Sequence, residues 1–115
     1  MEKKVLIVED QTWVHNHYHR KLDDKVSVIS AFSIEEAETL FAANPDIAAI
    51  VLDACVPGNR PNTPPLARKF RSVFAGPMIA TSSDKGYRQD LVAAGCDSES
   101  LKENLPEKLL QVLGL

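Results

Sequence analysis

The chain has 115 residues, of which 44% are hydrophobic and 25% are charged. This length fits one globular domain, which we expect to span residues 1–115, and the composition is too apolar for a disordered chain. The net charge of -3 argues against direct binding to nucleic acid, because such binders normally carry a basic stripe.

Targeting and crosslinking signals are also missing from the sequence. No stretch approaches the roughly 20 apolar residues of a membrane span, and the run 5–8 is too short for the apolar core of a signal peptide. The two cysteines, Cys55 and Cys96, are too few for a disulfide framework and lack metal-ligand spacing. The sequence therefore predicts a cytoplasmic protein without a membrane partner.

The first half of the chain alternates between strand and helix patterns. The expected elements are a strand at 5–8, a helix at 12–22, a strand at 26–29 and a helix from 34 to the Asn44-Pro45 pair. The continuous apolar run Val5 to Val8 is typical of a strand covered on both faces, as in a parallel sheet. Ser33 and Glu36 form the pattern of a capping box, which predicts the helix start.

The second half continues the alternation. The expected elements are a strand at 47–52, a loop at 56–65, a helix at 66–74, a strand at 78–81, a helix at 87–94 and a last helix capped by Asn104. Four prolines mark the loop at 56–65. Gly95 ends the predicted helix at 87–94. Residues 98–101 are polar, so only their place in the alternation suggests a fifth strand. The whole pattern predicts an α/β fold with a parallel sheet.

Polar side chains follow the predicted strands at the points where they end. Glu9 and Asp10 come after the first strand, Asp53 after the third, a hydroxyl cluster at 81–83 after the fourth, and Lys102 after the fifth. Each alone has an ordinary explanation as a helix cap, a turn residue or a solvated charge. Because ligands of open α/β sheets bind outside the carboxyl ends of the strands, their joint arrival there indicates a site.

This set of groups favours phosphoryl chemistry with a metal ion. Three close carboxylates repel one another and call for a cation, and oxygen ligands select a hard ion such as Mg²⁺. A carboxylate can act as a covalent nucleophile in phosphoryl transfer. A hydroxyl and an ammonium group would then neutralise the other phosphoryl oxygens.

The ordered set of motifs resembles the receiver domain of two-component response regulators. The resemblance rests on the acidic pair after the first strand, Asp53 with Pro57 four residues later, the hydroxyl after the fourth strand, and Lys102 seven residues after Gly95. It covers the whole chain. It implies a flavodoxin-like, doubly wound, five-stranded parallel sheet in the order 2-1-3-4-5 with helices on both faces.

The resemblance also implies a role for each site residue. Asp53 would be the phosphoacceptor; Glu9, Asp10, Asp53 and the backbone carbonyl of Cys55 would hold Mg²⁺; Ser82 and Lys102 would contact the phosphoryl group; and Thr81, Ser83 and Glu99 would form the switch region. Ser82 is chosen over Thr81 because it lies five residues after Pro77. Such a domain is not an enzyme beyond Mg²⁺-dependent autophosphorylation and slow autodephosphorylation. Its phosphodonor would be a histidine kinase or phosphotransfer protein, and its downstream target a further protein.

The sequence departs from the receiver pattern mainly in the parts that carry the output. Pro61 replaces a common glycine, Glu103 replaces a common proline after the lysine, and Glu99 replaces an aromatic switch residue. Because burying a carboxylate is costly, we expect Glu99 to stay in solvent. The conformational change should then be confined largely to the loop 82–86, and the signal should be read from that loop and from the proline-rich loop after Asp53.

Two other functional classes are considered. A degenerate receiver would bind a protein partner without being phosphorylated. Against this alternative, the expected site residues are all present: Glu9, Asp10, Asp53, Ser82 and Lys102. A phosphatase of the haloacid-dehalogenase type would need a second acid two residues after Asp53, where Cys55 stands.

Two features near the first helix have ordinary interpretations. His15 and His19 share a helix face, but two ligands make a weak metal site, so a solvated helix face is expected. Trp13 is expected to be a partly exposed packing aromatic near the mouth of the site.

Overall fold

The structure is a computed structural model that describes residues 2–115. Its elements in chain order are β1 (Lys4–Val8), α1 (Thr12–Leu22), β2 (Ser27–Ala31), α2 (Ile34–Ala43), β3 (Ile47–Asp53), α3 (Pro64–Arg71), β4 (Met78–Thr81), α4 (Lys85–Ala93), β5 (Ser98–Ser100), a 3₁₀ turn (Lys102–Asn104) and α5 (Leu105–Leu113). The strands form one parallel sheet in the order β2-β1-β3-β4-β5. The predicted fold class and strand order are confirmed.

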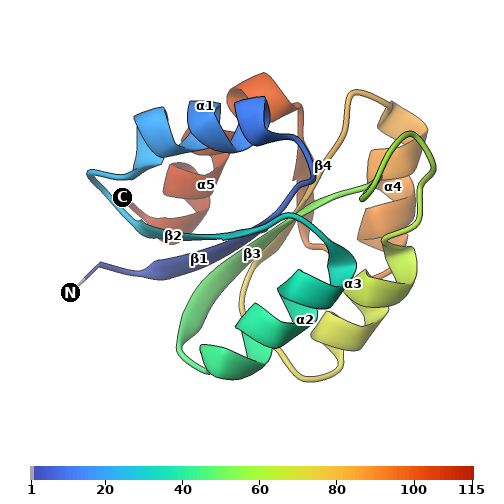
Figure 1. The fold of residues 1–115 in the computed structure, drawn as a ribbon, viewed down its shortest axis with the longest axis horizontal. Helices are drawn as coiled ribbons and strands as arrows, with labels where there is room; N and C mark the ends of the chain where they lie inside the picture. The colour runs from blue at the N-terminus through green and yellow to red at the C-terminus, as the bar shows by residue number, and fades with distance from the viewer. Residues whose placement is uncertain (1) are drawn as a thin grey trace.

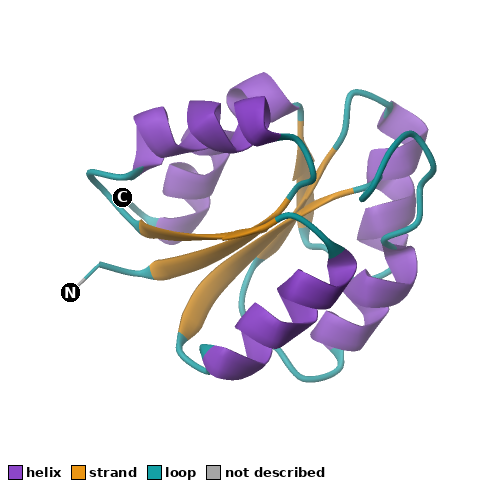
Figure 2. Ribbon diagram, viewed as in Figure 1, coloured by secondary structure: helices purple, strands orange, loops and turns teal. Residues whose placement is uncertain are grey.

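Helices cover both faces of this sheet (Figures 1 and 2). Helices α1 and α5 pack together on one face, while α2, α3 and α4 lie over the other. The core is therefore divided by the sheet into two apolar layers. Tyr18 and Leu109 lie in the first layer, and Phe70 and Leu91 in the second.

The apolar run of β1 reflects its position between these layers. Leu6 and Val8 pack into the layer under α2 to α4, whereas Val5 and Ile7 pack under α1 and α5. All four side chains are fully buried. Because alternate residues of a strand point to opposite faces, a central strand of a two-sided sheet needs apolar residues at every position.

The start of α2 follows the capping prediction with one difference. The Ser33 hydroxyl accepts a hydrogen bond from the Glu36 amide at 3.0 Å. The Glu36 carboxylate reaches the amide of Phe32 at 2.7 Å and not that of Ser33. The two side chains still bond free amides at the helix start. The Ser33 bond is as predicted, and the Glu36 bond is shifted by one residue, to the amide of Phe32.

Two later helices begin differently from the sequence prediction. Helix α3 starts at Pro64, two residues before the predicted start, and ends at Arg71. Proline is favoured in the first helical turn, where its missing amide costs nothing. Asn104 precedes α5 but its side chain makes no capping bond, because the 3₁₀ turn already leads the chain into the helix.

The polar segment after α4 does form the fifth strand. Its three residues pair with β4, and each side chain is only partly buried. Gly95, at φ +132, makes the turn before it, a backbone conformation that other residues rarely adopt. Main-chain pairing at a sheet edge thus supports a strand that side-chain pattern alone left weak.

The histidine-rich face of α1 is not the solvated surface that the sequence suggested. His15 is buried, its Nε2 lies 2.7 Å from the Glu9 carbonyl oxygen, and its ring packs against Phe32. His19 instead lies beside Asp23, with Nδ1 at 2.8 Å from the carboxylate. In residues 2–115 neither histidine belongs to a cluster of metal-ligating side chains.

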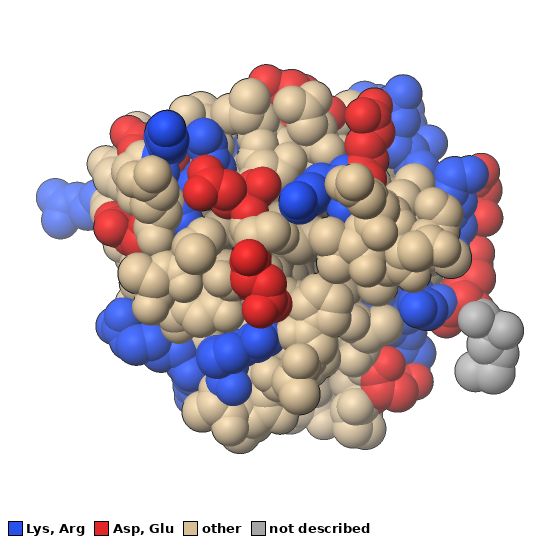
Figure 3. Space-filling view, turned by 180° about the vertical axis from the view of Figure 1, so that it is seen from behind, with Lys and Arg blue, Asp and Glu red and all other residues tan. Residues whose placement is uncertain are grey.

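Surface and helix properties agree with the composition. Acidic and basic side chains are interspersed on the face seen in Figure 3. Among the described residues, no helix combines the length and apolarity that crossing a bilayer requires.

Candidate functional site

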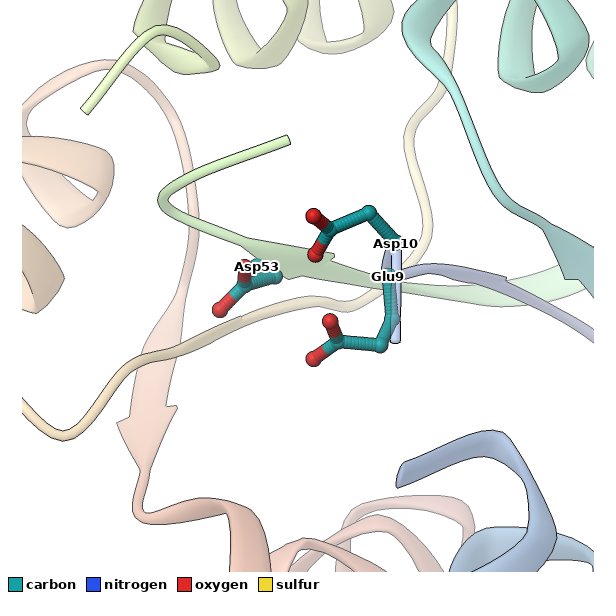
Figure 4. Close-up of side chains that lie close together, drawn as sticks. All are labelled: Glu9, Asp10 and Asp53. Carbon is teal, nitrogen blue, oxygen red and sulfur yellow. The ribbon is translucent and has the colours of Figure 1, made fainter. Parts of the chain in front are cut away.

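The predicted site residues meet at one edge of the sheet. Val8 pairs with Leu52, and Asp53 pairs with Thr81, so the residues that follow β1 lie beside the end of β3. Figure 4 shows Glu9, Asp10 and Asp53 close together at this edge. Parallel pairing thus brings Glu9 and Asp10 beside Asp53, which lies 43 or more positions away in the chain.

The three carboxylates form a compact acidic group. One oxygen from each of Glu9, Asp10 and Asp53 lies within 4.8 Å of the others. Glu9 and Asp53 are only 1% and 3% exposed, while Asp10 is partly exposed. Carboxylates this close and this buried repel one another unless a positive charge offsets them.

Lys102 supplies one such positive charge. Its Nζ lies 2.8 Å from Glu9 Oε1 and 3.4 Å from Asp53 Oδ1. Burial alone would lower the pKa of Lys102, but its contact with Glu9 and the charge of Asp53 outweigh this effect and raise it. The ammonium group therefore stays charged between two carboxylates.

One ammonium group does not fully compensate the carboxylates. Burial, followed by the charge of Asp53, raises the pKa of Glu9 to about 7. Burial also raises the pKa of Asp53, although Lys102 opposes the effect. Both carboxyl groups thus hold their protons more tightly than in water. A further cation beside them would lower their pKa values and favour the ionised form.

The donor set fits a hard divalent ion. The carboxylate oxygens of Glu9, Asp10 and Asp53 are the kind of ligand that Mg²⁺ prefers, and three of them leave coordination positions for water or a phosphoryl oxygen. Cys55 lines the same cavity, and its amide donates to Asp53 Oδ2 at 3.3 Å. Burial and the charge of Asp53 raise the pKa of its thiol, which keeps the sulfur protonated, so the backbone carbonyl oxygen is the ligand that Cys55 can offer a hard ion.

The three hydroxyl side chains at and after the end of β4 occupy different environments. Ser82 lines the cavity, is 6% exposed, and accepts a hydrogen bond from the Asp84 amide at 3.0 Å. Thr81 is buried within the strand, and Ser83 is exposed at the cavity rim. Of the three, Ser82 combines cavity lining with burial.

The site opens into a cavity of about 460 Å³. Its wall includes Asp10, Asp53, Ser82, Lys102 and Trp13. Trp13 is 65% exposed, so it stands at the mouth as expected and does not fill the core.

Glu99 differs from its sequence expectation. It is partly buried and its Oε1 lies 2.9 Å from Arg88 Nε. Arg88 also donates from Nη1 to the Ser82 carbonyl at 2.7 Å. The Glu99 side chain is thus 35% exposed and partly in solvent, and its carboxylate is paired with Arg88 on α4, which offsets the cost of its partial burial.

Sequence reasoning missed two contacts that shape the site. No sequence pattern marks Arg88 as part of the site, since it lies in an ordinary amphipathic helix, α4. The Gly58 amide donates to Asp10 Oδ2 at 3.0 Å, which folds the proline-rich loop toward the acidic group. Neither contact follows from local pattern, because each joins segments that only the tertiary fold brings together.

Solved structures with a similar fold align with nearly the whole chain. A two-component response regulator from Clostridium difficile aligns over 98% of this chain and 97% of its own, with a TM-score of 0.83 and 21% identity. The BeF3-activated N-terminal receiver domain of Klebsiella pneumoniae RstA aligns over 97% and 96%, with a TM-score of 0.80 and 23% identity. The chain has the receiver-domain fold.

The receiver fold also occurs within longer proteins. A probable two-component system response regulator/GGDEF domain protein matches 97% of this chain with a TM-score of 0.82 and 19% identity, and the chain spans 49% of its length. No protein-family model matches the sequence, and no curated protein is detectably similar to it. The likeness to receiver domains is thus carried by three-dimensional structure.

Proposed function

We propose that this receiver-fold domain accepts a phosphoryl group on Asp53 in a Mg²⁺-dependent reaction and changes conformation in response. The observation that carries the proposal is the meeting of three carboxylates and Lys102 at the carboxyl edge of the sheet. Asp53 is the candidate nucleophile because it ends the central strand β3 and lines the cavity.

The chemistry would form an acyl phosphate. A carboxylate oxygen of Asp53 would attack the phosphorus of a phosphohistidine, and the bond from phosphorus to the imidazole nitrogen would break as the new bond forms. Glu9, Asp10, Asp53 and the Cys55 carbonyl would hold the metal. When bound, Mg²⁺ would neutralise the carboxylates and a phosphoryl oxygen.

Two other groups would bind the transferred phosphoryl. The Lys102 ammonium group lies 3.4 Å from Asp53 Oδ1 and could therefore pair with a phosphoryl oxygen once Asp53 is phosphorylated. The Ser82 hydroxyl accepts from the Asp84 amide and keeps its own proton free to donate. Its movement toward the phosphoryl group would pull the adjacent loop, with Thr81 and Ser83 on either side, and begin the switch.

The comparisons support this proposal and suggest the kind of partner. Two of the similar structures are receiver domains activated with BeF3, those of Klebsiella pneumoniae RstA and of DrrB. By analogy, the phosphodonor would be a histidine kinase or phosphotransfer protein in the cytoplasm, and the output a protein contact. We further propose that residues 1–115 form a single receiver domain, which would turn over phosphate slowly without being an enzyme for another substrate.

The decisive experiment is phosphorylation with acetyl phosphate and Mg²⁺, followed by intact-mass measurement. We expect one phosphoryl adduct in the wild type and none in Asp53→Asn or in the presence of EDTA. Asp46→Asn is the matched control, because Asp46 is an exposed acid at the opposite end of β3 and should leave the adduct in place.

Two outcomes would contradict the proposal. An adduct that persists in Asp53→Asn would assign the acceptor elsewhere. The absence of any adduct in a folded wild-type protein, with phosphohistidine donors as well as acetyl phosphate, would favour a degenerate receiver that binds its partner without phosphorylation.

A further inference from the structure

The loop that follows Asp53 is tied down by two polar side chains. It runs from residue 54 to 63 between β3 and α3 and carries two prolines, Pro57 and Pro61. Residues 57–62 at its tip are exposed, so the packed core does not hold the tip, whereas Ala54, Val56 and Thr63 at its two ends are buried. Its end at Asn62 and Thr63 turns back onto its beginning.

Asn62 grips the backbone of Val56 from both sides. Its Nδ2 donates to the Val56 carbonyl at 2.6 Å, and its Oδ1 accepts from the Val56 amide at 2.8 Å. This pair of bonds imitates the pairing of two strands, although one partner is a side chain. It fixes the orientation of the peptide plane on each side of Val56.

Thr63 binds the backbone of Asp53 and Ala54 at the start of the loop. Its buried hydroxyl lies 2.7 Å from the Asp53 carbonyl oxygen and 3.0 Å from that of Ala54, so one proton is shared between two acceptors. Its amide also donates to the Ala54 carbonyl at 3.3 Å. We call Asn62 and Thr63 together the loop clamp.

The loop clamp engages every carbonyl of residues 53–56 except one. In residues 2–115, no hydrogen bond reaches the carbonyl of Cys55, while those of Asp53, Ala54 and Val56 are occupied. Cys55 is also the member of this segment, besides Asp53, that lines the acidic cavity. A free carbonyl between two fixed neighbours is held ready for a ligand that needs an oxygen donor.

We propose that Asn62 and Thr63 are positioning residues that hold the Cys55 carbonyl in place as a ligand for the divalent cation. The inference rests on the proposed metal site and deepens it. Neither side chain touches the cation; each acts through the backbone. A loop ordered in advance loses less freedom when the ion binds, so the clamp raises affinity without adding a ligand.

The proposal also explains the departure of this loop from the usual receiver pattern. Pro61 replaces a common glycine, which stiffens the approach to Asn62 because proline fixes its own backbone angle. Stiffness in this segment is useful where a side-chain clamp must meet its backbone partners in register.

The test is the affinity for Mg²⁺, read from Trp13 emission and from the carbonyl-carbon chemical shift of Cys55. Because partners that orient a metal ligand commonly contribute about tenfold or more to affinity, Asn62→Ala and Thr63→Val should each weaken binding by about that factor. Thr63→Ser keeps the hydroxyl and should restore near wild-type affinity. The Cys55 carbonyl shift should respond to Mg²⁺ in the wild type and respond less in the two weakened variants.

A matched control separates positioning from stability. Asn44 also donates from its side-chain amide to a backbone carbonyl, that of Leu40 at 2.9 Å, at the far end of the sheet. Asn44→Ala should lower stability to a similar degree but leave Mg²⁺ affinity unchanged. Asn62→Asp, which keeps the acceptor for the Val56 amide, provides a milder variant if Asn62→Ala does not fold.

The outcomes distinguish this inference from the function on which it rests. If Asp10→Asn abolishes binding while Asn62→Ala and Thr63→Val bind Mg²⁺ like the wild type, the clamp is refuted and the metal site stands. An unchanged Cys55 carbonyl shift on saturation with Mg²⁺ would also refute it. If the wild type itself does not bind Mg²⁺, both the metal site and the clamp's role fall together.

Discussion

Arg88 on α4 lies 2.9 Å from Glu99 on β5 and donates to the Ser82 carbonyl at 2.7 Å. The guanidinium group therefore joins the loop beside the acidic site to the edge strand of the sheet. Its side chain is only 13% exposed, and partly buried ion pairs of this kind are screened less by salt than surface pairs. This link stands where the receiver pattern has an aromatic switch residue.

The first prediction is that Arg88 carries a change at Ser82 to Glu99. On addition of Mg²⁺ and beryllofluoride, which stands in for the phosphoryl group, amide NMR shifts should change at Glu99 as well as in the loop 82–86. Arg88→Met should abolish the response at Glu99 and keep that of the loop.

Arg71 offers the control for this prediction. It also bridges a backbone carbonyl, that of Gly76, and a carboxylate, that of Asp97, but near the amino ends of β4 and β5, away from the acidic site. Arg71→Met should leave the Glu99 response intact. An undiminished Glu99 response in Arg88→Met would show that the signal takes another route.

The second prediction ranks the two acids after β1. Glu9 is already paired with Lys102 at 2.8 Å, whereas Asp10 is more exposed and its carboxylate accepts a hydrogen bond from the Gly58 amide. We expect Asp10→Asn to weaken Mg²⁺ binding by roughly tenfold or more and Glu9→Gln to weaken it less. Titration of Trp13 emission measures both. Equal affinity of the wild type and Asp10→Asn would exclude Asp10 as a ligand.

The third prediction concerns Ser82. Ser82→Ala removes one hydrogen bond and no charge, so it should cost about 1 kcal/mol of stability and still permit phosphorylation. The amide shifts of the loop 82–86 on beryllofluoride binding should become smaller. If Thr81→Ala has this effect and Ser82→Ala does not, the phosphoryl contact belongs to Thr81.

The fourth prediction is a pH dependence of stability without divalent cations. The pKa of Glu9 is about 7 in the folded chain against an ordinary value of 4.5. Between these values the folded state holds a proton that the unfolded state has released. The resulting stabilisation is fully present below pH 4.5 and is lost as the pH rises through 7. Its size is on the order of 3 kcal/mol.

Urea unfolding in EDTA at pH 4.5 and pH 8 measures this dependence. Glu9→Gln cannot release the proton, so its stability should fall less over this range than that of the wild type. Parallel curves for the two proteins would mean that Glu9 titrates at its ordinary value. Saturating Mg²⁺ should reduce the difference, because the ion favours the ionised carboxylate.

The sequence by itself determined the order of the elements and the residues at their ends. Continuous apolar runs such as Val5 to Val8 specify strands buried on both faces, and Asp53 and Lys102 follow from where those strands stop. These features are local or periodic, so they can be read without knowing what packs against what. The strand β5 could be predicted only weakly from the sequence, because its side chains are polar. Its main-chain pairing with β4 is what supports it in the structure.

Only the tertiary structure decided which side chains from distant segments meet. The burial of His15 under Phe32, the pairing of Arg88 with Glu99, and the grip of Asn62 on Val56 leave no periodic trace in the sequence. Each depends on a distance set by the packing of several elements at once. For the same reason the raised pKa of Glu9 could not be anticipated, since it arises from burial and from a carboxylate 44 positions away, at Asp53.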